Sequence, residues 1–155
     1  MGFQILPLPS RPFEHLFNKS TAELAQFGAI PYTADHNPGY PCRLRLADAK
    51  PGERLILVNY EHLKVASPYR SSHAIFITDG AQTCQPICND IPTYLSSRPL
   101  SVRSFDSFGM MCQAALCEGQ NIQPTFEQLL APQEVEYLHV HTAIRGCYLA
   151  RVESV

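Results

Sequence analysis

The sequence contains no tryptophan, no long apolar run and no excess of positive charge. A helix that crosses a membrane needs about 18 or more consecutive apolar residues, and no segment supplies them. Twelve basic and fourteen acidic residues give a net charge of −2, so the chain lacks the positive charge needed to bind a nucleic-acid backbone. We therefore expect neither a membrane nor a nucleic acid as a partner.

The first residues also lack the features of a secretory signal peptide, because they have no positively charged start and prolines interrupt their apolar residues. We expect a soluble cytoplasmic protein whose six cysteines are thiols rather than disulfides. The spacing of Cys84 and Cys88 matches neither a redox pair nor a usual zinc pair. Cys112 and Cys117 lie in an apolar stretch and are predicted to be small buried side chains.

Short segments of alternating or continuous apolar character predict one α+β domain over residues 1–155. Thirteen prolines and eight glycines keep these segments short. Helices are predicted over 20–29 and 125–131, and strands over 42–48, 54–62, 73–78, 100–106, 110–119, 136–142 and 146–153. Because no strand is regularly followed by a crossover helix, we predict a mainly antiparallel, curved or barrel-like sheet of about six or seven strands with two or three short helices.

Two histidines occupy alternate positions of the strand predicted near the carboxyl end. Side chains alternate along a strand, so Tyr137, His139 and His141 share one face while Leu138 and Val140 point to the core. Two such imidazoles can converge on one metal ion or one anion. The simpler interpretation is a half-exposed polar face whose histidines bond to neighbouring groups or to water. In the return strand, alternation places Tyr148 and Arg151 on opposite faces.

A second group of polar residues follows the strand predicted over 54–62, on which Tyr60 and His62 share a face. The loop after it supplies a phenol, a cation, two hydroxyls and an imidazole, from Tyr69, Arg70, Ser71, Ser72 and His73. Such a set can hold a carboxylate or phosphate and move a proton. The alternative is an ordinary surface loop that turns at Pro68.

A third segment, Asn37–Arg43, is a loop stiffened by prolines that presents Tyr40, Cys42 and Arg43. A constrained loop loses little entropy when it binds, so it positions side chains well. Cys42 would act as a nucleophile only beside an imidazole or a cation that lowers the pKa of its thiol. Otherwise it is a buried residue of a turn.

Five motifs together, "PGYPCR", "NYEH", "SPYRSSHAIF", "FDSFGMM" and "YLHVHTAIRGCYLARV", resemble a family of short bacterial proteins catalogued as domain of unknown function 1203. The likeness extends from about the first predicted helix to Val152. It implies a single-domain bacterial protein, and it supplies no activity, no cofactor and no role for any residue.

Our first hypothesis is a site for a small anionic ligand, with or without enzymatic activity. The loops 37–43 and 67–73 and the face 137–141 would converge at one end of the sheet. Arg43, Arg70 or Arg145 would hold the anion, and His73, His139 or His141 would be the acid or base. The remaining candidate ligand contacts are Tyr40, Tyr60, His62, Tyr69 and Ser72.

Two other hypotheses stay open. A metal site would join His139 and His141 to His62, His73 or Cys42, although no carboxylate accompanies the pair and no H-E-x-x-H or C-x-x-C motif is present. A non-enzymatic structural or interaction module would use the polar residues only to stabilise its loops. No motif names a cofactor, since P-loop, Rossmann and G-x-S-x-G patterns are all missing, and the oligomeric state is left open.

Overall fold

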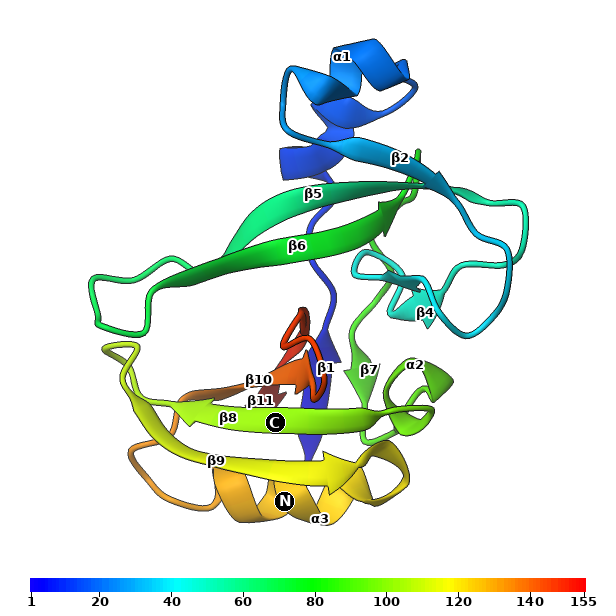
Figure 1. Cartoon of the computed structure of the whole chain (residues 1–155). Helices are drawn as coiled ribbons and strands as arrows, with labels where there is room; N and C mark the ends of the chain where they lie inside the picture. Colours follow the sequence, from blue (N-terminus) through cyan, green and yellow to red (C-terminus); the bar gives the residue numbers. More distant parts are fainter.

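The apolar segments of the sequence form two antiparallel sheets that lie one above the other in this computed structural model, which describes residues 1–155. Helix α3 (Ile122–Leu130) covers the outer face of the larger sheet, and α1 (Thr21–Ala25) lies at the opposite end of the molecule (Figure 1). The prediction of a mainly antiparallel α+β fold is confirmed. Both sheets are open, and no closed barrel is present.

The larger sheet has six strands in the order β7-β1-β11-β10-β8-β9. Their bounds are β1 Phe3–Leu6, β7 Ile87–Cys88, β8 Pro99–Phe105, β9 Met111–Glu118, β10 Tyr137–Thr142 and β11 Tyr148–Ser154. Helix α3 presents Phe126 and Leu129 to the sheet, where they share one buried core with Leu138 and Val140 of β10. That packing explains why the apolar half of β10 faces α3 and why its other half faces the second sheet.

The smaller sheet has the order β2-β5-β6, with bounds β2 Ile30–Thr33, β5 Arg54–Leu63 and β6 Ser71–Thr78. A second core lies between this sheet and the larger one, and it includes Ile56 of β5, Ile75 of β6 and Tyr148 of β11. The 3-10 helix η1 (Arg11–Leu16) adds two apolar side chains to the same core. A second 3-10 turn, η2 (Gly119–Asn121), leads into α3.

The segment 42–48, predicted as one strand, is instead a tight hairpin of β3 (Pro41–Cys42) and β4 (Ala47–Asp48). Leu46 has a φ of +50°, which reverses the chain. Leu44 and Leu46 alternate with arginines in the sequence, but they do not share one strand face, because they enter two different cores. Arg43, predicted as an anion contact presented by the loop 37–43, is only 2% exposed.

The other predicted strands correspond to β5, β6, β8, β9, β10 and β11. The sequence did not predict β1, β2, β7 or the short helix α2 (Thr93–Ser96), and the first predicted helix is shorter than 20–29. All six cysteines are free thiols, as predicted. Cys112 is exposed and Cys117 is half-buried, so the prediction that both are buried was wrong for Cys112. No helix has the length and apolar character that crossing a bilayer demands.

Candidate functional site

A β-bulge in the last hairpin decides which side chains face the smaller sheet. Val140 is paired with Ala150 and His141 with Tyr148, so Leu149 is an extra residue in β11. Cross-strand partners point to the same side of a sheet. Tyr148 therefore lies beside His141, and Arg151 lies beside His139 on the same face. Simple alternation placed Tyr148 and Arg151 on opposite faces, and this prediction was wrong because the bulge shifts the register by one residue.

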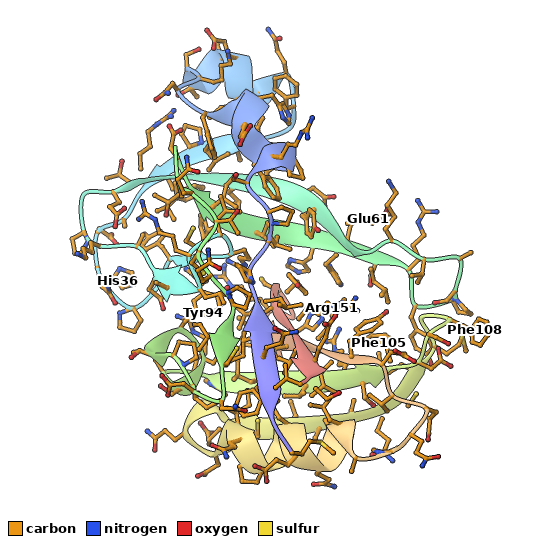
Figure 2. The ribbon with its side chains drawn as sticks, turned by 180° about the vertical axis from the view of Figure 1, so that it is seen from behind. His36, Glu61, Tyr94, Phe105, Phe108 and Arg151 are labelled. Carbon is orange, nitrogen blue, oxygen red and sulfur yellow. The ribbon has the colours of Figure 1, made fainter.

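The smaller sheet covers the face that carries these residues. A histidine cluster lies between the two sheets, formed by His62 of β5 with His139 and His141 of β10. The ring centroid of His62 lies 5.0 Å from that of His141 and 6.0 Å from that of His139. His139 and His141 are only 3% and 1% exposed, so the interpretation of a half-exposed polar face was wrong. Figure 2 shows Arg151 and Phe105 of the larger sheet in the space between the two sheets.

Hydrogen bonds fix the protonated nitrogen in two rings of the histidine cluster. His141 donates from Nδ1 to the carbonyl oxygen of Gly146 at 2.9 Å. Ser71 donates its only hydroxyl proton to the Tyr69 carbonyl, so it accepts from Nε2 of His62 at 3.1 Å. The Nδ1 atoms of His62 and His139 are buried without any hydrogen-bond partner. A buried ring nitrogen without a partner among the protein groups is costly, because its interaction with water is lost on burial.

Burial keeps all three imidazoles neutral. It lowers the pKa of His139 to about 2, of His141 to about 3 and of His62 to about 4. The nearby positive charge of Arg103 on β8 adds to the lowering in each case. Burial likewise lowers the pKa of the Arg103 guanidinium.

The metal hypothesis finds no preformed ligand set here. No group of three or more His, Cys, Asp or Glu side chains is arranged so that it could hold a metal ion. Cys42, the candidate sulfur ligand, is fully buried, and its Sγ accepts the backbone N–H of Thr78 at 3.2 Å.

A cleft of about 580 Å³ lies where β6, the segment before β3 and the β10–β11 turn come together. Its lining residues are Tyr32, His36, Gly39, Tyr40, Pro41, Arg43, Leu57, His73, Ala74, Phe76, Arg98, Pro99, Thr142, Ala143, Ile144, Arg145 and Cys147. Three of these residues are arginines and none is acidic. The protein as a whole carries a net charge of −2, so this positive surface runs against the average charge of the molecule.

Arg43 is the most deeply buried of the three cleft arginines. Its Nε donates to the Tyr148 carbonyl at 2.7 Å, and its Nη1 donates to the Pro41 carbonyl at 2.6 Å. Both acceptors are neutral, so the buried cation has no carboxylate partner. Charged groups are rarely buried without an opposite charge, because desolvation is then uncompensated.

Arg98 and Arg145 complete the positive wall. Arg98 donates from Nη2 to Oδ1 of Asp48 at 2.5 Å, but its Nη1 is buried without a partner. Arg145 lies exposed in the β10–β11 turn. That turn is held by internal bonds, since Cys147 donates its N–H to Oγ1 of Thr142 at 3.0 Å. The backbone that carries Arg145 is therefore held in place by hydrogen bonds within the turn.

The structure brings together only part of the predicted site. Tyr40, Arg43, His73 and Arg145 line the cleft, whereas His139 and His141 lie in the histidine cluster. Tyr60 and His62 line a second cavity of about 530 Å³ beside η1.

The β5–β6 turn does not join the cleft. Tyr69, Arg70 and Ser72 are exposed there and do not line it. Arg70 instead donates to Glu61 at 2.8 Å. Of the three-way convergence that we expected, the loop 37–43 and His73 line one cleft, whereas 67–72 and the face 137–141 do not line it.

Sequence reasoning missed Arg98, Arg103, Tyr32 and Phe76. Arg103 could have been found from the sequence, because alternation along β8 places its side chain on the same face of the strand as that of Ser101. Arg98 follows a four-residue helix that no pattern predicted.

Comparison with known proteins adds a family and no activity. The model of a family described as "Protein of unknown function (DUF1203)" matches residues 39–154. The chain belongs to the DUF1203 family. Searches of the curated proteins and of the solved structures gave no match. In this DUF1203 protein the matched segment contains all three cleft arginines and His73, while Tyr32 and His36 precede it.

Proposed function

We propose that this DUF1203 protein binds a small anionic molecule in the arginine-lined cleft. The observation that carries the proposal is the charge of the lining, which has three arginines and no acidic residue. Asp48 neutralises part of the charge of Arg98, and no carboxylate pairs with Arg43 or Arg145. A bound anion would supply the missing opposite charge.

The hydrogen-bonding capacity of the cleft supports the same proposal. Guanidinium groups present several N–H donors in a plane that matches a carboxylate or a phosphate. Arg98 has one such nitrogen buried and unused. A side-chain movement that brings this nitrogen to the surface of the cleft would let a bound oxyanion accept the bond that the protein leaves unmade, which is favourable because an unpaired buried donor is costly.

His73 gives the cleft a group that can exchange protons. The carbonyl oxygen of Ala74 can only accept, so Nδ1 of His73 donates to it at 3.1 Å. The neutral ring then has its lone pair on Nε2. This arrangement is what general-base chemistry on a bound ligand requires, so the proposed binding site is also the place to look for enzymatic activity.

The first test compares a charged probe with its neutral counterpart. Isothermal titration with benzoate and with benzamide separates charge from shape, and we expect benzoate to bind at least about tenfold more tightly, the effect of one charged hydrogen bond. Arg145→Gln should weaken benzoate binding. Arg70→Gln, which removes another exposed arginine outside the cleft, should leave it unchanged. Equal binding of benzoate and benzamide would overturn the proposal.

A further inference from the structure

We propose that the ligand of the cleft is an aromatic oxyacid, in which a ring is joined to a carboxylate or phosphate. This inference rests on the proposed anion-binding function and specifies the body of the ligand. The evidence comes from the side of the cleft that is lined by aromatic residues and has no arginine.

That wall is aromatic. Phe76 of β6 lies between two tyrosines, with ring centroids 5.3 Å from Tyr32 and 5.4 Å from Tyr40. Both tyrosines are inclined steeply to Phe76, at 83° and 61°. Edge-to-face contact is the arrangement that aromatic rings prefer, so a ligand ring can extend a packing pattern that already exists.

The aromatic and cationic walls adjoin. The backbone N–H of Arg43 donates to the carbonyl oxygen of Phe76 at 3.4 Å, so the two residues are neighbours on adjacent segments. Tyr40 and Arg43 also lie on one short segment. A ligand that contacts both walls therefore needs its ring and its oxyanion close together, as in benzoate or phenyl phosphate.

Apolar surface at the rim favours a ligand with an organic body over a bare inorganic ion. Tyr32 is 40% exposed and Ile144, at the tip of the β10–β11 turn, is 88% exposed. Both line the cleft. A ligand ring would remove part of this surface from water, which is favourable roughly in proportion to the area covered. Inorganic phosphate would leave it uncovered.

The decisive experiment titrates the protein with five probes: benzoate, cyclohexanecarboxylate, benzamide, phenyl phosphate and inorganic phosphate. We expect benzoate to bind about threefold to tenfold more tightly than cyclohexanecarboxylate, the range that aromatic pairing adds to simple burial. Phenyl phosphate should bind more tightly than inorganic phosphate. The stronger of benzoate and phenyl phosphate identifies which oxyanion the arginines prefer.

A matched pair of variants assigns the effect to the cleft. Tyr32→Leu should remove the preference for benzoate over cyclohexanecarboxylate. Tyr69→Leu should keep it, because Tyr69 is equally exposed, at 39% against 40%, but lies outside the cleft. Neither substitution removes a core side chain, so both variants should fold.

The outcomes separate the two proposals. Equal affinity for benzoate and cyclohexanecarboxylate, with no binding of benzamide, would overturn the aromatic inference and leave the anion site intact. Benzamide binding as tightly as benzoate would overturn the anion site itself. Failure of all five probes to bind would overturn both.

Discussion

The imidazole of His62 is stacked nearly parallel to the phenol of Tyr148, with ring planes 12° apart and centroids separated by 5.4 Å. His62 belongs to β5 of the smaller sheet and Tyr148 to β11 of the larger one, so this stacked pair joins the two sheets. His139 meets the same tyrosine edge-on at 5.0 Å. Tyr148 also gives its carbonyl to Arg43, which connects the histidine cluster to the wall of the cleft.

Acid should weaken the association of the two sheets. The folded-state pKa values of His139 and His141 are about 2 and about 3, against about 6.5 for histidine in an unfolded chain. The unfolded state therefore binds protons more readily. The free energy of unfolding should have its full value above about pH 7. Below about pH 6.5 it should fall by up to about 3 kcal/mol per pH unit through these two groups.

Urea unfolding between pH 8 and pH 5 measures this slope, in a range where most carboxylates stay ionised. Arg103, Arg151, His62 and His73 face the two histidines, and the fixed positive charges of Arg103 and Arg151 oppose their protonation. His139→Leu should remove about a third of the measured slope, because one of the three buried histidines with a lowered pKa is lost. A free energy of unfolding that does not change from pH 7.5 to pH 5 would contradict the burial of neutral histidines.

Gly119→Ala should destabilise the protein and disturb the cleft. A Cβ at this position would overlap the carbonyl oxygen of Leu95 and would lie 2.7 Å from that of Arg98. Both are backbone atoms, so relief requires movement of the segment that carries Arg98. We expect a loss of about 3 kcal/mol, the upper part of the range for overpacking, and weaker benzoate binding.

Gly80→Ala is the control for this substitution. Gly80 has a φ of +76°, and no atom outside its chain neighbours lies within 4 Å of the position that a Cβ would take. Alanine at position 80 should therefore destabilise the protein only through backbone strain, by about 1–2 kcal/mol. Thermal and urea unfolding give both values. An equal effect of the two substitutions, or unchanged binding by Gly119→Ala, would argue against the tight contact beneath Arg98.

Thiol labelling should report on the cleft. Cys88 and Cys112 are exposed and should react quickly with iodoacetamide, whereas the buried Cys42 should react only after unfolding. Cys147 lines the cleft, so benzoate should slow its labelling and leave that of Cys112 unchanged. Mass spectrometry of the digested protein measures each site. Protection of both cysteines to the same degree would indicate a global effect and not occupancy of the cleft.

Ser67→Ala should loosen the contact between two turns. The hydroxyl of Ser67, in the β5–β6 turn, donates to the carbonyl oxygen of Gly109, in the β8–β9 turn, at 2.8 Å. Its loss should cost about 1 kcal/mol. Ser72→Ala, at an exposed position of the same region, should cost less than about 0.5 kcal/mol. Urea unfolding measures the free energy of unfolding of both variants. Equal values for the two variants would contradict a stabilising role for the contact.

The strands that sequence analysis found are those whose side chains obey one simple pattern. β5 is a long apolar segment, and β10 alternates cleanly, so both were predicted close to their true positions. β1 has only four residues and β7 only two. Such strands exist because neighbouring strands pair with them, and a single short segment of sequence contains no record of that pairing.

The candidate site was predictable in its residues more than in its arrangement. His62, His139 and His141 were identified by chemistry and spacing, and they do come together. Their burial could not be foreseen, because it comes from the second sheet. Arg43 was predicted to hold an anion from a loop, yet its side chain is buried beside the β3–β4 hairpin.

The pairing of β1 with β11 has a consequence for how the chain is made. Phe3 pairs with Ser154, so two neighbouring strands of the larger sheet are separated by almost the whole sequence. A ribosome releases β1 long before it has synthesised β11. Until then β1 has only the two-residue β7 as a strand partner. The six-stranded sheet therefore cannot be completed until β11 has emerged from the ribosome, so its formation depends on a contact between segments that are far apart in sequence.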